Sequence, residues 1–126
     1  MKAQKVLLVD DDPLMHMLYS KHLEKAGWQV LNASGGLEAI DIAKKELPTA
    51  VVMDLMMNDL DGFSAIRELR KMPGTQNIPA IIITSNGQIH DAIRKEAVQT
   101  GASSVLTKPF SPRQLLDELS KFTQGN

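Results

Sequence analysis

Four short stretches of the sequence carry side chains that could together bind a metal ion and a phosphoryl group. Asp10–Asp12 follows one apolar run, Asp54 ends another, and Thr84 and Lys108 lie at or just beyond the ends of two more. Carboxylates gathered in one place are unfavourable, because each raises the pKa of its neighbours. Mg²⁺ relieves such a cluster, since it takes oxygen ligands and commonly combines one or two carboxylates with waters and a phosphate.

Formal charge favours this combination of groups. Asp10, Asp11 and Asp54 carry three negative charges, and Lys108 with Mg²⁺ would carry three positive ones. An Asp can act as a covalent nucleophile towards phosphorus. Phosphoryl transfer asks the protein mainly for positioning and for neutralisation of the phosphoryl oxygens, which Lys108, the Thr84 hydroxyl and the cation could share.

Taken singly, each of these residues also has an ordinary structural explanation. Asp12 precedes Pro13 and suits a helix N-cap followed by proline at the first helical position. Asp10 or Asp11 alone could lie in a solvated turn, and Lys108 could be a surface lysine. The functional interpretation therefore depends on whether the fold brings the four stretches together.

The apolar pattern predicts five strands that alternate with five helices. Continuous apolar runs predict strands buried on both faces, whereas runs mixed with polar residues predict edge strands. The buried strands are expected at 5–9, 50–53 and 79–84, and the edge strands at 28–33 and 104–107. Apolar residues at helical spacing fill the intervals, for example Leu37, Ile40, Ala43 and Leu47, which mark one predicted helix face.

A strand followed by a helix, repeated five times, predicts an α/β fold: a doubly wound (βα)5 domain with a five-stranded parallel sheet and right-handed crossovers. Placing the mixed strands at the edges gives the strand order 2-1-3-4-5. The topological switch point then lies between the first and third strands, where open α/β sheets bind their ligands beyond the carboxyl ends. All four stretches are at such ends, so the sequence predicts one pocket.

Composition narrows the function classes. The 126 residues suit a single domain, 1–126, and the absence of cysteine excludes disulfides and thiolate metal sites. No apolar run approaches the roughly 20 residues that cross a bilayer, so we expect a cytoplasmic protein without a membrane partner. A net charge of −1 with few aromatic residues argues against direct binding of nucleic acid.

Four motifs resemble the receiver domain of bacterial two-component response regulators, in order and in spacing, over essentially the whole chain. They are Val9–Pro13, Met53–Gly62, Ile83–Ser85 and Thr107–Phe110. The strand order 2-1-3-4-5 is already known in this family, so the agreement of the predicted order with it is not independent support for the resemblance. The resemblance implies a phosphoacceptor that assists its own phosphorylation and dephosphorylation, rather than an enzyme. Its phosphodonor would be a sensor histidine kinase or a phosphotransfer protein.

The resemblance also implies a role for each site residue. Asp54 would accept the phosphoryl group, Asp11 would bind Mg²⁺ directly together with Asp54 and the Met56 backbone carbonyl, and Asp10 would act mainly through water. Thr84 would hydrogen-bond the phosphoryl group, Lys108 would pair with it, and the Lys108–Pro109 bond is expected to be cis. Met56 and Asn86 would flank the phosphoryl group and tune its hydrolysis.

Two positions depart from the family pattern. Asn58 stands where proline is usual, which predicts a looser loop with the metal ligands retained. Val105 stands where many members carry Tyr or Phe, and valine is too short and too stiff about χ1 for the inward swing of that aromatic ring. We therefore expect phosphorylation to be intact and its relay to the output face to be altered. His16, His22 and His90 show no metal or catalytic spacing and are expected at surface or satisfied positions.

Other interpretations stay open. A receiver-shaped interaction module that is never phosphorylated would not need all five of Asp10, Asp11, Asp54, Thr84 and Lys108. A small phosphatase with Asp10 as nucleophile fits less well, since no cap domain is present. A flavodoxin-like nucleotide binder would need a phosphate loop where the three aspartates stand. Because the chain ends just beyond the last predicted helix, we expect either a stand-alone receiver with a protein target or one whose output domain is missing.

Overall fold

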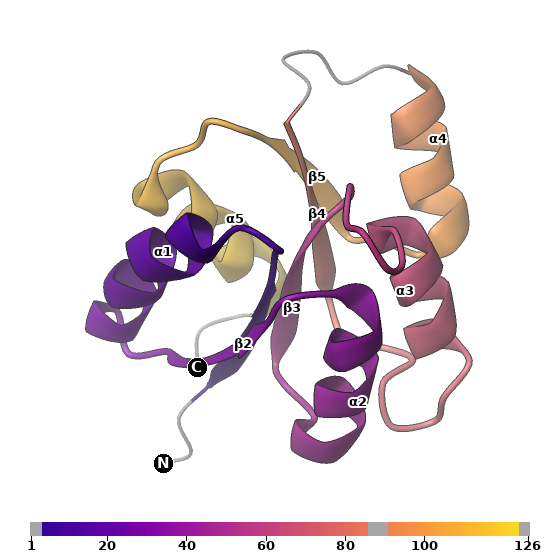
Figure 1. The fold of residues 1–126 in the computed structure, drawn as a ribbon, viewed down its shortest axis with the longest axis horizontal. Coiled ribbons are helices and arrows are strands. Elements are labelled where there is room, and N and C mark those ends of the chain that lie inside the picture. The colour runs from indigo at the N-terminus through magenta and orange to yellow at the C-terminus, as the bar shows by residue number, and fades with distance from the viewer. Residues whose placement is uncertain (1–3, 86–90, 124–126) are drawn as a thin grey trace.

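The computed structural model describes residues 4–85 and 91–123 of the chain, shown in Figure 1. Strands and helices alternate through these ranges, as the sequence predicts. In chain order they are β1 (Lys5–Val9), α1 (Pro13–Lys25), β2 (Gln29–Ala33), α2 (Gly36–Glu46), β3 (Ala50–Asp54), α3 (Gly62–Arg70), β4 (Ala80–Thr84), α4 (Asp91–Thr100), β5 (Ser104–Thr107) and α5 (Pro112–Thr123). Asn86 and His90, for which the sequence makes predictions, lie outside the described residues.

The five strands form one parallel sheet in the order β2-β1-β3-β4-β5, which confirms the predicted topology. Helices α1 and α5 cover one face of the sheet, and α2, α3 and α4 cover the other (Figure 1). Strands β1 and β3 lie side by side although their connections leave in opposite directions, to β2 and to β4. The switch point is therefore between β1 and β3.

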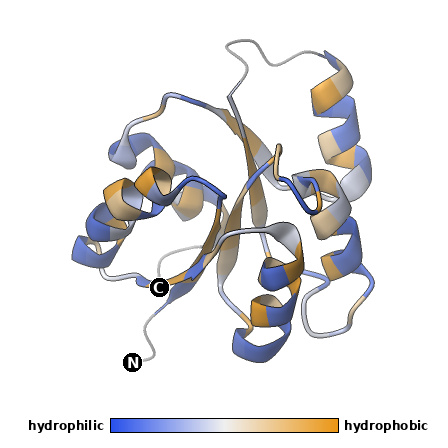
Figure 2. Ribbon diagram, in the orientation of Figure 1, coloured by the Kyte–Doolittle hydropathy of each residue, from blue (hydrophilic) through white to orange (hydrophobic). Residues whose placement is uncertain are grey.

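The core consists of two apolar layers, one on each face of the sheet. Alternate residues of the central strands feed different layers: Leu7 packs with α2 and α3, whereas Leu8 packs with α1 and α5. Every residue of β3 and β4 is buried, and in β1 only Lys5 is partly exposed. The edge strands β2 and β5 are mixed, as predicted. Figure 2 shows hydrophobic colouring along the central strands, whereas the helices alternate between hydrophobic and hydrophilic residues.

The predicted N-cap of α1 is confirmed, and other helix ends have ordinary capping residues. The Asp12 carboxylate accepts a hydrogen bond from the Leu14 N–H at 3.0 Å and so caps α1. Gly27 and Gly101 follow α1 and α4 with φ of 99° and 88°, a conformation that favours glycine at a helix end. Ser111 caps α5 by accepting from the Gln114 N–H at 3.0 Å.

The predicted inner face of α2 is confirmed for Ile40 and Ala43, which pack in the core, but it is wrong for Leu37 and Leu47. Leu37 and Leu47 are 61% and 55% exposed, whereas Ala39 and Ala43 are fully buried. The reason is the close packing of α2 against α3 and the sheet, which admits small side chains in the shared layer. In the described part of the chain, no helix has both the length and the apolar character needed to cross a bilayer.

Candidate functional site

The sheet register brings the predicted site residues to one edge. Val9 pairs with Met53 in the β1–β3 ladder, so Asp10 and Asp54 follow at the same level. Asp54 pairs with Ile83 in the β3–β4 ladder, and Thr84 pairs with Thr107 in the β4–β5 ladder. Lys108 is the next residue after that pair. Strand ends that are far apart in sequence thus supply neighbouring side chains.

Three carboxylates form the centre of this edge. Oxygen atoms of Asp10, Asp11 and Asp54 all lie within 4.8 Å of one another. Asp10 is 1% exposed and Asp54 is 6% exposed, whereas Asp11 is open to solvent. Two buried carboxylates and one exposed carboxylate at this spacing suit a hard cation that approaches from solvent and keeps part of its water shell.

Both oxygens of Asp10 are already engaged. Oδ1 accepts a hydrogen bond from the Asp12 N–H at 2.9 Å, and Oδ2 accepts one from the Lys108 Nζ at 3.1 Å. Lys108 is itself held by its backbone N–H, which donates to the Thr84 carbonyl at 2.8 Å. The Lys108–Pro109 bond is cis, which confirms that prediction. The buried Asp10 and the partly exposed Lys108 therefore form an ion pair beside the phosphoacceptor candidate.

The electrostatics of Asp54 follow from this arrangement. The pKa of its carboxyl group is raised from 3.8 to about 6, chiefly by burial and next by the neighbouring Asp10 carboxylate. Lys108 and the Met56 backbone N–H act in the opposite direction and lower it. A carboxylate that ionises with difficulty next to other carboxylates gains free energy from a nearby cation.

The loop between β3 and α3, residues 55–61, is closed at its base. The Leu55 N–H donates to the Ile83 carbonyl at 2.8 Å, and the Gly62 N–H donates to the Leu55 carbonyl at 2.8 Å. Gly62 is required by close approach, because a Cβ there would lie 2.7 Å from the Asp54 carbonyl oxygen. Met56 is 69% exposed near the mouth of this loop. Its carbonyl is thus within the segment that directly follows Asp54.

Two residues near the site were not identified from the sequence. His16 joins Asp10 to β2, with Nε2 2.7 Å from the Asp10 carbonyl and Nδ1 2.5 Å from Asn32 Oδ1. The Tyr19 hydroxyl donates to the Phe110 carbonyl, and the two rings stack with centroids 4.8 Å apart. Both links hold the loops that carry Asp10 and Lys108. The expectation that His16 is satisfied is confirmed, although its partners were not foreseen.

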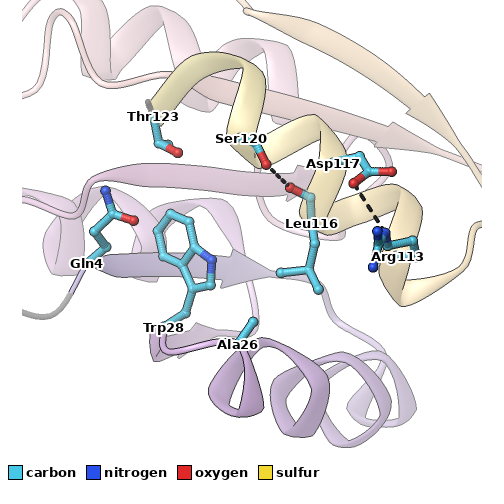
Figure 3. Close-up of a pocket in the computed structure, with 8 residues that line it drawn as sticks. All are labelled: Gln4, Ala26, Trp28, Arg113, Leu116, Asp117, Ser120 and Thr123. Atoms are coloured by element: carbon cyan, nitrogen blue, oxygen red, sulfur yellow. Dashed lines mark hydrogen bonds and ion pairs between the residues drawn. The ribbon is translucent and has the colours of Figure 1, made fainter. Parts of the chain in front are cut away.

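A hollow between the start of β2 and α5 lies away from the three carboxylates (Figure 3). Its volume is about 340 Å³, and Trp28 and Leu116 supply its apolar part. The charged pair in its wall, Arg113 with Asp117 at 3.5 Å, is exposed. Nothing in its lining repeats the convergence of carboxylates, lysine and hydroxyl, so the candidate site is the one at the carboxyl ends of the strands.

Comparison with known proteins agrees with the fold and the site. The family model of the response regulator receiver domain matches residues 6–120, and the chain belongs to that family. The probable transcriptional regulator ycf27 of Porphyra purpurea is 38% identical over 114 residues, which are 90% of this chain and 45% of that protein. Protein PilH of Pseudomonas aeruginosa is 37% identical over 121 residues, 96% of this chain and 98% of PilH. The chain thus spans about half the length of ycf27 and nearly all of PilH.

Solved structures give the same result. The receiver domain of the sensor histidine kinase PA1611 from Pseudomonas aeruginosa is 30% identical, with a TM-score of 0.87 over 98% of this chain and all of that one. That structure contains a magnesium ion coordinated in the active site cleft. The chemotaxis protein CheY4 of Vibrio cholerae is 29% identical, with a TM-score of 0.91 over 96% of this chain and 99% of that one. The chain is a response regulator receiver domain.

Proposed function

We propose that this receiver accepts a phosphoryl group on Asp54 from a phosphohistidine of a sensor histidine kinase or phosphotransfer protein. The observation that carries the proposal is the convergence of Asp10, Asp11 and Asp54 with Lys108 and Thr84 at one edge of the sheet. The protein would act as a phosphoacceptor that assists its own phosphorylation and dephosphorylation, not as an enzyme that releases a product from a separate substrate. A cytoplasmic location fits such a partner.

The acidic cluster fits a magnesium ion. Asp11 and Asp54 would bind it directly with the Met56 carbonyl, and Asp10 would act through water because Lys108 and the Asp12 N–H already engage its oxygens. The donors are all oxygen atoms, which is the preference of a hard cation. When bound, the ion would supply positive charge to the phosphoryl oxygens and to the Asp54 carboxylate.

The transfer step uses the Asp54 carboxylate as nucleophile. One carboxylate oxygen would form the new O–P bond, while the N–P bond of the donor histidine breaks and its electron pair returns to the ring nitrogen. Lys108 would move from Asp10 towards the incoming phosphoryl oxygens, and the Thr84 hydroxyl would donate to another. The strand ends fix the backbones that carry Lys108 and Thr84, so the contribution of these residues is mainly positioning and charge neutralisation.

An exposed apolar patch suits the docking of the donor. Leu14, Met17 and Leu18 are 68%, 71% and 55% exposed, and their spacing puts them on one side of α1. This helix starts directly after Asp12, so the patch adjoins the acidic site. Three large apolar side chains in water at this place favour a partner with an apolar helical surface, such as the helices that carry a phosphohistidine.

Signal output would use the face formed by α4, β5 and α5. Val105 lies on β5 opposite Ile82 in the β4–β5 ladder, and it lines a hollow of about 370 Å³ with Ala97 and Val98. A valine fills little of this space, so phosphorylation would reshape the face without the swing of an aromatic ring. We also propose that residues 1–126 form one receiver domain, whose target is a separate protein or an output domain outside this chain.

Phosphotransfer from a panel of histidine kinases tests the proposal, with Asp54→Asn as the matched variant. We expect Mg²⁺-dependent labelling of the wild type and none of Asp54→Asn, with correct folding of both checked by circular dichroism. Labelling that survives in Asp54→Asn but is lost in Asp10→Asn would favour the phosphatase-like alternative instead. A folded wild type that binds Mg²⁺ but accepts no label from any donor would support the interaction module.

A further inference from the structure

The start of α2 is capped by a side chain from another element. Its N-cap residue is Gly35, which has no side chain to offer. Asp59, in the 55–61 loop, accepts from the Gly36 N–H at 3.0 Å through Oδ1 and from the Leu37 N–H at 3.1 Å through Oδ2. Oδ1 also accepts from the Leu60 N–H at 2.7 Å. One carboxylate therefore ties the loop that follows Asp54 to the first turn of a helix.

Two glycines make room for this contact. A Cβ on Gly35 would lie 2.8 Å from both Asp59 carboxylate oxygens, and a Cβ on Gly36 would lie 2.9 Å from the Leu60 Cβ and carbonyl oxygen. Gly35 has φ of −164°, an extended conformation that any residue adopts, so its backbone does not require glycine. Close approach of the loop explains the glycine pair.

Charge strengthens the contact although Asp59 is exposed. The N–H groups of Leu37 and Gly36 lower the pKa of the Asp59 carboxyl group below its ordinary value, so it is ionised at neutral pH. A negative charge at the first turn of a helix also interacts favourably with the helix dipole. The Asp59 carboxylate thus accepts charge-assisted hydrogen bonds from two backbone N–H groups of α2, and these bonds resist displacement of the loop.

The loop is held at its two ends and is open between them. At its base, the Gly62 N–H donates a hydrogen bond to the Leu55 carbonyl. At its far end, Asp59 accepts a hydrogen bond from the Gly36 N–H of α2. Met56 and Asn58 lie between these anchors and are largely exposed. The position of the Met56 carbonyl therefore depends on both anchors.

We infer that Asp59 is a positioning residue for the metal site: by binding the backbone of Gly36 and Leu37, it holds the loop that presents the Met56 carbonyl. This inference rests on the proposed function, because it takes that carbonyl as a Mg²⁺ ligand. Asp59 itself does not touch the metal in this scheme. Its oxygens are occupied by backbone donors, and its effect passes through the loop.

Asp59→Ala tests the inference, with Glu38→Ala as the matched control. Glu38 accepts from the Ser34 N–H at 2.8 Å and from the Ser34 hydroxyl at 3.0 Å at the same end of α2, and within the described residues it makes no hydrogen bond to the loop. Loss of either contact should destabilise the protein to a similar degree. Only Asp59→Ala should weaken Mg²⁺ binding. We expect its Kd to rise about fivefold, which corresponds to the free energy that one helix cap contributes.

Three measurements separate the outcomes. Mg²⁺ titration calorimetry gives Kd, thermal unfolding gives the common structural effect, and amide NMR of the metal-free protein reports on residues 55–60. Asp59→Asn keeps one carbonyl acceptor and should give an intermediate Kd. Equal loss of Mg²⁺ affinity in Glu38→Ala, or an unchanged Kd and unchanged loop amides in Asp59→Ala, would overturn the inference alone. A wild type that binds no Mg²⁺ would overturn the metal site and this inference with it.

Discussion

Replacement of Asp54 by Asn should stabilise the metal-free protein at pH 8, although it removes the proposed phosphoacceptor. The folded protein buries an ionised carboxylate next to Asp10 at this pH, and the neutral amide removes that charge at nearly constant size. Raising a pKa from 3.8 to about 6 corresponds to about 3 kcal/mol of unfavourable free energy for the ionised form, at about 1.4 kcal/mol per pH unit. Relaxation and water entry reduce this, so we expect a gain of about 1–3 kcal/mol.

The sign of the pH dependence follows from the same shift. Between pH 3.8 and about 6 the folded state of the wild type binds the Asp54 proton more tightly than the unfolded state does. Its free energy of unfolding therefore receives a contribution from Asp54 that rises as the pH falls through about 6 and is complete below 3.8. The advantage of Asp54→Asn should be largest at pH 8 and should vanish near pH 4.

Urea unfolding at pH 4, 6 and 8 without Mg²⁺ provides the assay, with Asp117→Asn as the control for removing an exposed carboxylate. The side chain of Asp117 is 65% exposed, so its replacement should change the free energy of unfolding by less than about 0.5 kcal/mol. Added Mg²⁺ should stabilise the wild type and leave Asp54→Asn nearly unchanged. If Asp54→Asn is less stable than the wild type at pH 8, the conclusion that the buried Asp54 charge destabilises the folded state is wrong.

Three further substitutions test other parts of the site. Lys108→Ala should cost about 1–3 kcal/mol in urea unfolding without Mg²⁺, because it leaves the Asp10 carboxylate buried and unpaired, and Mg²⁺ should recover part of the loss. Gly62→Ala should cost about 1–3 kcal/mol in the same assay, since its Cβ would lie 2.7 Å from the Asp54 carbonyl oxygen. Met56→Glu should change the lifetime of the phosphorylated form by severalfold with little effect on stability, because the side chain is 69% exposed beside the proposed phosphoryl group.

Two of these substitutions have a matched control variant elsewhere in the chain. Gly74→Ala should be nearly neutral, because the nearest atom to its Cβ would be the flexible Leu47 Cδ2 at 3.2 Å. Lys121→Ala removes an exposed cation and should leave stability within about 0.5 kcal/mol. For Met56→Glu, an unchanged dephosphorylation rate would contradict a role beside the phosphoryl group.

The sequence was sufficient to predict the fold and to predict which polar residues lie at the ends of the strands. Apolar runs of strand length mark β1, β3 and β4, and polar residues directly follow or end each of them, so Asp10 and Asp54 could be placed at one edge before any contact was known. The Lys108–Pro109 geometry followed from the family resemblance. Local pattern and topology together therefore carry the arrangement of the acidic site.

Residues that act through distant partners could not be predicted. His16 contacts Asn32 on β2, Tyr19 contacts Phe110 across 91 positions, and Asp59 contacts the first turn of α2. No spacing rule within one element points to such pairs. The prediction for α2 was wrong in part for a related reason: Ala39 faces inward because α3 packs close by, which hydrophobicity alone does not reveal.

The position of Lys108 beyond the edge strand has a consequence for folding. β5 has four residues, all of them partly exposed, and it is bonded only to β4 in the sheet. Without β5, the other strands would gather Asp10, Asp11 and Asp54 but not the lysine that balances their charge. Docking of β5 would then be favoured by charge neutralisation as well as by apolar burial. Salt screens the carboxylates and metal cations compete with Lys108 for them, so both should weaken this electrostatic contribution to the docking of β5.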